Sequence, residues 1–549
     1  MKQPNRSNRK NNSGRKNIDR CNCDRGFFLR AGVLIVLLAT SSLTVLNHGG
    51  KTLAGEQPNI VIILADDLGW NAVGYRNPRM ETPNIDRLVR QGMELEHFYV
   101  APMCSPTRAG LLTGRYPIRF GCARAVIPPQ RDHGLPVTET TLAEALAAKG
   151  YENRGIFGKW HLGHRRTKWH PLQQGFSQFI GHYNGAIDYF DLTREGERDW
   201  HHQFEPSAEE GYATDLIAEA AAEFITTSAS QQTPYLCYVP FNAPHSPFQA
   251  PEEAIKRFES LSELEGLSGK NRKQALERLK IYSAMIWRMD QGIGKILAAI
   301  ESTNTANNTM VWFLSDNGGV GNIWENNTPL RGSKLTVYEG GIRVPAVVRW
   351  PAKIPAGSKL HSTAGYIDVF PTLLAAAETV ESPTGKQAAS ENFLDGINLL
   401  PLLVEPKHRS QAAFNTAREK IDQRPWYSYH GQQGEESEHL SVLQNGWKLK
   451  VNGQRLTQVS DLNEPNVQHE LFYLATDPNE QRNQSQQNPE TVNRLAHMLV
   501  EYRNLQPQDA VPRYGVGAEG FKPHDSWRAA PESPEKLLGS SPLDAGSNQ

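Results

Sequence analysis

The stretch from Asn59 to Asp67 (NIVIILADD) is a continuous apolar run that ends in two carboxylates. A strand that exposed one face to water would alternate apolar and polar residues, and this one does not. It therefore predicts a strand covered on both faces, which is typical of the centre of a parallel sheet with helices on each side. The acids would then lie at the carboxyl edge of that sheet.

Further apolar segments alternate with helix-like segments along the chain. Strands are predicted at residues 151–157, 235–239 and 310–315, and helices at residues 138–150, 215–225 and 281–300. This alternation predicts an α/β fold whose core is a large, mostly parallel sheet sandwiched by helices. From about residue 400 the strands become short and hairpin-like, with pieces at 441–443 and 447–451. They predict a smaller C-terminal subdomain built on an antiparallel sheet.

Polar side chains lie shortly after four of the apolar runs. They are Asp66 and Asp67, the pair Lys159 and His161, then His245, and finally Asp316 and Asn317. In open α/β sheets, ligand-binding residues collect beyond the carboxyl ends of the strands. We therefore expect these side chains to form one shared site.

Four of these residues offer oxygen atoms that suit a hard divalent cation. Asp66, Asp67 and Asp316 supply carboxylates, and Asn317 supplies an amide oxygen. Such a set favours calcium, whereas zinc would favour histidine and thiolate ligands. Alternatively, Asp66 and Asp67 could form only a strand-end turn, and Asp316 and Asn317 only an Asx turn.

Residues 104–115 (CSPTRAGLLTGR) place Cys104 ahead of Pro106 and Arg108 at fixed spacing. A lone cysteine is most often a buried structural residue. This run, however, resembles the signature of the type I sulfatases, which belong to the alkaline phosphatase superfamily. The resemblance implies that Cys104 is oxidised before folding to 3-oxoalanine (formylglycine), whose hydrated aldehyde is the nucleophile. It also implies that Arg108 is a fixed positive charge beside that nucleophile.

Three later segments extend the resemblance. Residues 158–163 (GKWHLG) resemble the second sulfatase signature and imply that Lys159 neutralises the sulfate and His161 contacts the formylglycine hydroxyl. His245, in NAPHSP, matches the family's H-x-P histidine, and Lys334, in LRGSK before YEGG, matches the lysine that faces the ester oxygen. The matching metal positions imply one Ca²⁺, bound by the four oxygen donors and by residue 104. The loops at 128–136 and 170–190 are similar to those of arylsulfatase A-like and N-acetylgalactosamine-6-sulfatase-like members.

The chain is expected to divide into four parts. Residues 1–54 are basic, hold an apolar run at 31–46, and resemble a signal peptide cleaved after Ala54, although an uncleaved membrane anchor is the alternative. Residues 55–400 would be the catalytic domain, 401–507 the small-sheet subdomain and 508–549 an irregular tail. A signal peptide and a membrane anchor would both place the enzyme in a periplasmic, extracellular or lumenal space. Cys122 and Cys237 could form at most one disulfide, and nothing in the sequence requires it.

The expected activity is that of a sulfuric ester hydrolase of the arylsulfatase type, with aryl sulfates as test substrates and sulfated carbohydrates as natural ones. A formylglycine-generating enzyme would be a partner during maturation. The net charge of −1, with an acidic body, argues against a nucleic-acid partner. Two alternatives remain: a phosphonate or phosphodiester hydrolase of the same superfamily, and a catalytically silent carbohydrate-binding relative.

Overall fold

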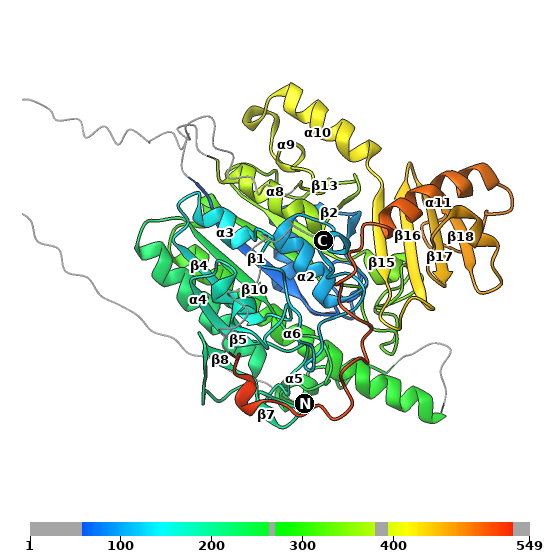
Figure 1. The fold of residues 1–549 in the computed structure, drawn as a ribbon. Coiled ribbons are helices and arrows are strands. Elements are labelled where there is room, and N and C mark those ends of the chain that lie inside the picture. Colours follow the sequence, from blue (N-terminus) through cyan, green and yellow to red (C-terminus); the bar gives the residue numbers. More distant parts are fainter. Residues whose placement is uncertain (1–56, 263–268, 379–392, 531–549) are drawn as a thin grey trace, which may run out of the picture. The chain divides into compact units, whose positions relative to one another are not determined.

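A ten-stranded mixed sheet with helices on both faces forms the larger part of the fold (Figure 1). This computed structural model describes residues 57–262, 269–378 and 393–530. In spatial order the strands are β13 (Ser358–Leu360), β2 (Met93–Leu95), β12 (Ala346–Arg349), β11 (Thr309–Ser315), β1 (Asn59–Ala65), β10 (Tyr235–Pro240), β4 (Asn153–Lys159), β5 (Gln178–His182), β8 (His201–His202) and β9 (Glu205–Pro206).

The centre of this sheet is parallel and its flanks are partly antiparallel. β11, β1, β10, β4 and β5 run parallel to one another, whereas β12, β8 and β9 run antiparallel to their neighbours. The predicted mostly parallel α/β sheet is thus confirmed in the centre. Because parallel neighbours end at the same edge, the residues after β1, β4, β10 and β11 are brought together.

The two faces of β1 belong to different hydrophobic cores. Ile60, Ile62 and Leu64 pack into one core, and the alternate residues Val61 and Ile63 pack into the other. The first core is closed by α2 (Cys104–Thr113), α3 (Leu142–Ala147) and α8 (Tyr366–Ala376), and the second by α1 (Pro83–Gln91), α4 (Ala213–Ser230), α5 (Glu252–Lys256) and α6 (Gly269–Ser302). Burial on both faces explains why β1 lacks polar alternation.

Two helices differ in length from their predictions. α3 is shorter than 138–150 because Thr141 caps it: its hydroxyl accepts from the Glu144 amide, and the Glu144 carboxylate accepts from the Thr141 amide. α6 is longer than 281–300, since it begins at Gly269. Residues 270–274 are exposed, so the apolar periodicity that predicts a helix is missing there.

A separate four-stranded antiparallel sheet follows, as predicted. It consists of β15 (Trp426–His430), β16 (Glu438–Gln444), β17 (Trp447–Gly453) and β18 (Gln468–Tyr473), with α11 (Pro489–Arg503) packed against it (Figure 1). Asn445 and Gly446 join β16 to β17 with φ angles of 52° and 79°. Positive φ at both positions is what a two-residue hairpin turn requires.

The remaining short elements surround these two sheets. They are β3 (Phe98–Tyr99), β6 (Thr193–Arg194), β7 (Glu197–Arg198), α7 (Glu339–Ile342), β14 (Ala364–Gly365), α9 (Leu400–Leu403) and α10 (Gln411–Gln423), with 3-10 turns at Pro117–Phe120, Thr167–Trp169, Pro171–Gln173, Ala306–Asn308, Pro406–His408, Val459–Asn463 and Asp525–Trp527.

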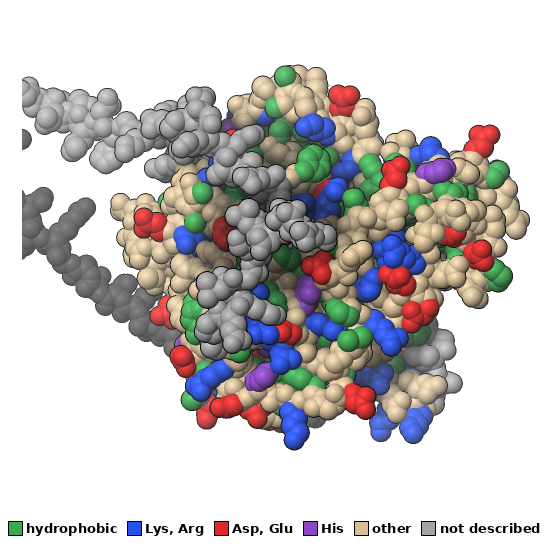
Figure 2. Space-filling view, in the orientation of Figure 1, with side chains coloured by type: hydrophobic (Ala, Val, Ile, Leu, Met, Phe, Trp, Pro, Cys, Tyr) green, Lys and Arg blue, Asp and Glu red, His purple; other side chains and the backbone are tan. Residues whose placement is uncertain are grey.

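Charged side chains of both signs are interspersed over the face seen in Figure 2. This mixture agrees with the nearly balanced formal charge of −1. An anionic substrate must therefore be held by local groups and not by a field of one sign. The predicted signal peptide or anchor at residues 1–54 lies outside the described residues. None of the described helices is long and apolar enough to span a bilayer.

Candidate active site

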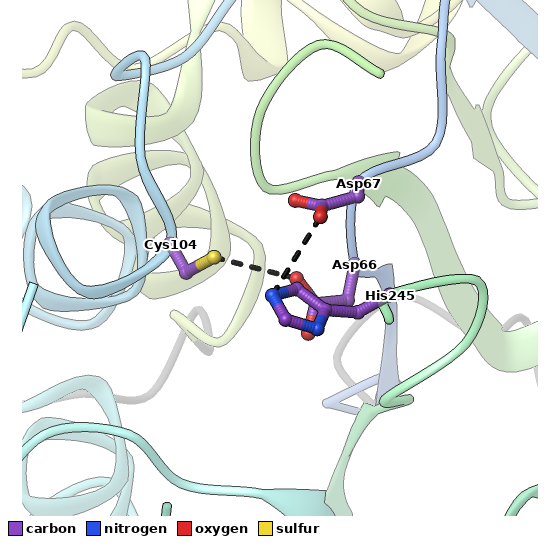
Figure 3. A group of neighbouring side chains, drawn as sticks. All are labelled: Asp66, Asp67, Cys104 and His245. Atoms are coloured by element: carbon purple, nitrogen blue, oxygen red, sulfur yellow. Dashed lines mark hydrogen bonds and ion pairs between the residues drawn. The ribbon is translucent and has the colours of Figure 1, made fainter. Parts of the chain in front are cut away.

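The predicted site residues meet at the carboxyl edge of the large sheet. Asp66 and Asp67 follow β1, Lys159 ends β4, and Asp316 follows β11. The chain after β10 brings His245 to the same place, where its ring lies 3.6 Å from an oxygen of Asp67 (Figure 3). The side chains that the sequence places beyond the strand ends thus lie close together in the fold.

Cys104 is the first residue of α2, and its side chain is buried in the middle of this group. Its Sγ lies 3.4 Å from Oδ1 of Asp66, 3.4 Å from Oδ1 of Asn317 and 3.5 Å from Nζ of Lys334. Burial, together with the charges of Asp316 and Asp66, raises the pKa of the Cys104 thiol well above its ordinary value. An unmodified thiol here is therefore protonated and a weak nucleophile.

Arg108 lies one helical turn after Cys104 and is completely buried. Its Nη2 and Nε donate to Oδ2 of Asp316 at 2.7 and 3.1 Å, and its Nη1 donates to the carbonyl of Lys159 at 2.9 Å. Burial opposes the guanidinium charge, but the carboxylates of Asp316 and Asp66 more than offset it and raise the pKa of Arg108. The side chain is thus a fixed cation that also holds two strand ends in register.

Two lysines bring further positive charge to the cluster. Nζ of Lys159 lies 2.5 Å from Oδ2 of Asp66, and Nζ of Lys334 lies 2.6 Å from Oδ1 of Asp67. Burial alone would lower the pKa of Lys334, yet Asp67 and the other neighbouring anions raise it. Conversely, burial would raise the pKa of Asp67, but Lys334 and His245 bring it below its ordinary value.

The two histidines are held in their neutral forms. Burial, and then the charges of Lys159 and Arg108, hold the pKa of His161 well below its usual range. Burial and Lys334 lower the pKa of His245 to about 3. Nδ1 of His161 is buried and has no hydrogen-bond partner among the described residues, which leaves it available to a ligand.

Gly185 leaves room for the His161 ring and is a residue that sequence reasoning missed. A Cβ atom at Gly185 would lie 2.6 Å from Cε1 and Nε2 of His161, so a larger residue would displace the ring. His161 itself has a φ of 55°, and its amide donates to the carbonyl of Tyr183 at 3.0 Å. A glycine in an irregular loop carries no sequence signal of such packing.

The neighbouring carboxylates of Asp66, Asp67 and Asp316 give the site the oxygen donors that a hard divalent cation prefers. One ligand atom from each of Asp66, Asp67, Cys104 and His245 lies within 4.8 Å of the others (Figure 3). Asp316 lies beside them, and its pKa is raised to about 6 by burial and by the charge of Asp66. Buried carboxylates that repel one another are the condition that a bound cation relieves. The geometry brings His245 into this group, whereas the sequence suggested only oxygen donors and residue 104.

An open cavity leads to the cluster. His161, His245, Lys334 and Cys104 line it, and so do three residues that the sequence did not reveal: Arg194, Gln432 and Tyr514. These three come from β6, from the segment after β15 and from the C-terminal tail. They lie in loops or beside short strands, where neither periodicity nor a motif marks them.

Cys122 and Cys237 are buried and, like Cys104, are free thiols. Burial raises the pKa of both. The disulfide that the sequence left open is therefore not formed. Neither thiol lines the cavity.

Comparison with known proteins gives a consistent family assignment. A family model described as Sulfatase matches residues 58–379. The N-acetylgalactosamine-6-sulfatase of Mus musculus is 32% identical over 484 residues, which cover 81% of this chain and 84% of that protein.

Solved structures share the fold. The crystal structure of Ps i-CgsB in complex with k-i-k-neocarrahexaose has a TM-score of 0.70 and 26% identity, and covers 85% of this chain and 98% of that one. The phosphonate monoester hydrolase of Agrobacterium radiobacter has a TM-score of 0.57 at 19% identity, covering 83% of this chain and 97% of that one, and this likeness shows the fold alone.

Proposed function

Because the chain belongs to the sulfatase family and is a sulfuric ester hydrolase, we propose that it removes sulfate from carbohydrate sulfate esters and also cleaves aryl sulfates. In this proposal Cys104 is converted to formylglycine and one Ca²⁺ occupies the acid cluster. The observation that carries the proposal is the position of Cys104, a buried thiol enclosed by Asp66, Asn317 and Lys334 at the base of an open cavity.

The thiol itself is unsuited to the reaction, which supports its modification. Its raised pKa keeps it protonated, and its burial keeps it from bulk solvent. A formylglycine hydrate at residue 104 would supply a hydroxyl that attacks sulfur and a second hydroxyl that lets the sulfate leave. A bound cation, added to the charges of Lys159 and Lys334, would favour the ionised form of such a hydroxyl.

Asp66, Asp67, Asp316 and Asn317 would hold the cation together with residue 104. A bound Ca²⁺ would supply positive charge toward the sulfate oxygens. Lys159 and Lys334, which now neutralise Asp66 and Asp67, would add their own charges on either side of the sulfate. Fixed cations in a site of low polarity stabilise the charge that develops in the transition state.

The histidines would divide the proton transfers. His245 stands beside Lys334 at the cavity wall and would favour the departing alcohol, whereas His161 would act on residue 104 as sulfate is released. Both are neutral in the free enzyme. Each would therefore accept a proton before it donates one, or gain it as the substrate anion enters.

Export completes the proposal. The N-terminal segment would direct the enzyme to a periplasmic, extracellular or lumenal space, and a formylglycine-generating enzyme would act on Cys104 before the fold buries it.

A direct test combines peptide mass spectrometry at residue 104 with turnover of aryl sulfate and aryl phosphodiester substrates. Formylglycine at residue 104 with a preference for the sulfate supports the proposal. Preferred turnover of the phosphodiester would favour the phospho-hydrolase alternative. Absence of any turnover by protein that carries the aldehyde would favour a silent relative.

A further inference from the structure

The C-terminal tail contributes Tyr514 to the lining of the cavity above Cys104. We call residues 508–530 the strap. Its backbone is fixed near the cavity by hydrogen bonds from Val511 N to Gly121 O at 2.8 Å and from Tyr514 N to Gln432 O at 2.9 Å. Arg131 Nη2 donates to Arg513 O at 2.9 Å. These bonds hold Tyr514, which is 39% exposed, at the edge of the cavity.

The far end of the strap fixes a second cavity residue. Trp527 is fully buried, and its Nε1 donates to the carbonyl of Arg194 at 3.2 Å. The amide of Ser526 donates to Glu197 Oε2 at 3.1 Å. Because Arg194 ends β6 and Glu197 begins β7, the strap holds the hairpin that presents Arg194 to the cavity.

The charged side chains of the cavity wall are both cations. The described residues that line it include Arg194 and Lys334 but no aspartate or glutamate. Lys334 is already engaged with Asp67. Nη2 of Arg194 forms a half-exposed ion pair with Glu195 at 3.5 Å, and its Nε has no hydrogen-bond partner among the described residues. A guanidinium in this condition is suited to bind an oxyanion through two parallel hydrogen bonds.

We propose that Arg194 and Tyr514 form a saccharide subsite that selects substrates with a second anionic group beside the sulfate to be removed. This inference rests on the proposed function. Arg194 binds the second oxyanion, which is either the carboxylate of an acidic sugar or another sulfate ester. Tyr514 supplies a flat aromatic surface with a hydroxyl, suited to a sugar ring that is apolar on its face and polar at its edge.

The test compares three saccharides that carry the same sulfate ester: one otherwise neutral, one with a neighbouring carboxylate and one with a second sulfate. An aryl sulfate serves as the reference substrate, and kcat/KM is measured for each. In Arg194→Ala the ratio of kcat/KM for a dianionic saccharide to that for the neutral one should fall at least tenfold, since a charged hydrogen bond is lost. In Tyr514→Ala the ratio of kcat/KM for each saccharide to kcat/KM for the aryl sulfate should fall about tenfold.

Arg513→Ala and Val516→Ala are matched controls. Both residues belong to the strap, but their side chains do not line the cavity, and both ratios should stay at the wild-type value. Arg194→Gln, which keeps a polar side chain of similar reach, guards against misfolding of the hairpin, and melting temperatures are measured for every variant.

The outcomes separate the two proposals. If the kcat/KM ratio falls in Arg194→Ala for only one of the dianionic saccharides, that saccharide identifies the oxyanion that Arg194 binds. If the ratio falls for both, Arg194 binds either oxyanion. Ratios that change less than threefold in folded Arg194→Ala and Arg194→Gln overturn the subsite. If the wild-type protein cleaves no sulfate ester, the proposed function itself fails, which is a different result.

Discussion

Arg108 and Asp316 form an ion pair that solvent does not reach, with Nη2 2.7 Å from Oδ2. The pair joins α2, which begins at residue 104, to the end of β11. Removing one partner of a buried pair leaves an uncompensated charge and costs about 3–5 kcal/mol. The same contact therefore positions the proposed nucleophile and stabilises the strand end that offers a cation ligand.

Active protein should carry an aldehyde at residue 104. Cys104→Ala should abolish turnover, because alanine has no hydroxyl to attack sulfur. Cys237→Ala, at another buried free thiol, is the matched control and should keep kcat near wild type. Peptide mass spectrometry checks the modification. High activity from protein with a wholly unmodified thiol at residue 104 would contradict this prediction.

Calcium should stabilise the fold as well as support activity. Saturation to 100 times Kd would add about 2.7 kcal/mol to the free energy of unfolding. Asp316→Asn should lose bound calcium, measured by elemental analysis, together with activity. Asp368→Asn is the control, because Asp368 forms a comparable buried pair with Arg424 and neither residue lines the cavity. Asp368→Asn should lower the melting temperature but keep the metal. Equal metal loss in Asp368→Asn and Asp316→Asn would contradict the assignment of Asp316 as a calcium ligand.

Substitution of His245 and of His161 should slow different steps of the reaction. In His245→Ala, substrates with strongly basic leaving alcohols should slow by roughly 10²–10⁴-fold, and acidic phenols far less. His161→Ala should instead retain sulfate on residue 104 during turnover, visible by intact mass. Phenyl sulfates of graded acidity provide the comparison. Equal slowing of all leaving groups by His245→Ala, with no retained sulfate in His161→Ala, would overturn the division.

Lys448 should be essential to stability though it is remote in sequence from the site motifs. On β17 it is buried between Glu339 and Glu480, at 2.8 and 2.9 Å, and so connects the small sheet to α7. Lys448→Met should lower the free energy of unfolding by about 3–5 kcal/mol, because two buried carboxylates lose their cation. Adding Glu339→Gln and Glu480→Gln should recover part of that loss in urea unfolding. No recovery would show that the charge is not the cause.

His170 should make the fold sensitive to mild acid. Its Nδ1 accepts from the amide of Leu172 and its Nε2 bonds the carbonyl of Gln203, while burial lowers its pKa to about 4. The unfolded chain, with an ordinary histidine pKa near 6.5, binds the proton more tightly. Stability is therefore complete above about pH 6.5 and is lost as the pH falls toward 4, by roughly 3 kcal/mol at most.

The measurement for His170 is urea unfolding at pH 7 and pH 4.5. His170→Phe should lower stability at pH 7, since it lacks both hydrogen bonds, but should narrow the difference between the two pH values. An unchanged difference would assign the acid sensitivity to other groups.

The sequence predicts those parts of the site that follow regular strands. Asp66, Lys159 and Asp316 lie at the ends of apolar runs, so the rule that parallel strands share a carboxyl edge places them together. Arg194, Tyr514 and Gly185 could not be predicted, because their positions depend on loops whose course is set by tertiary contacts. The hydrogen bond from Trp527 to Arg194 spans 333 residues, and no local pattern encodes it.

The two-sided burial of β1 has a practical consequence for altering substrate range. Because Ile62 and Val61 belong to different cores, changes near β1 disturb both layers, and mutagenesis there will mostly yield unfolded protein. The β6–β7 hairpin and the strap residues 512–518 contribute no side chain to either core. A combinatorial library confined to residues 193–198 and 512–518 would vary the saccharide wall while the acid cluster at the strand ends stays intact.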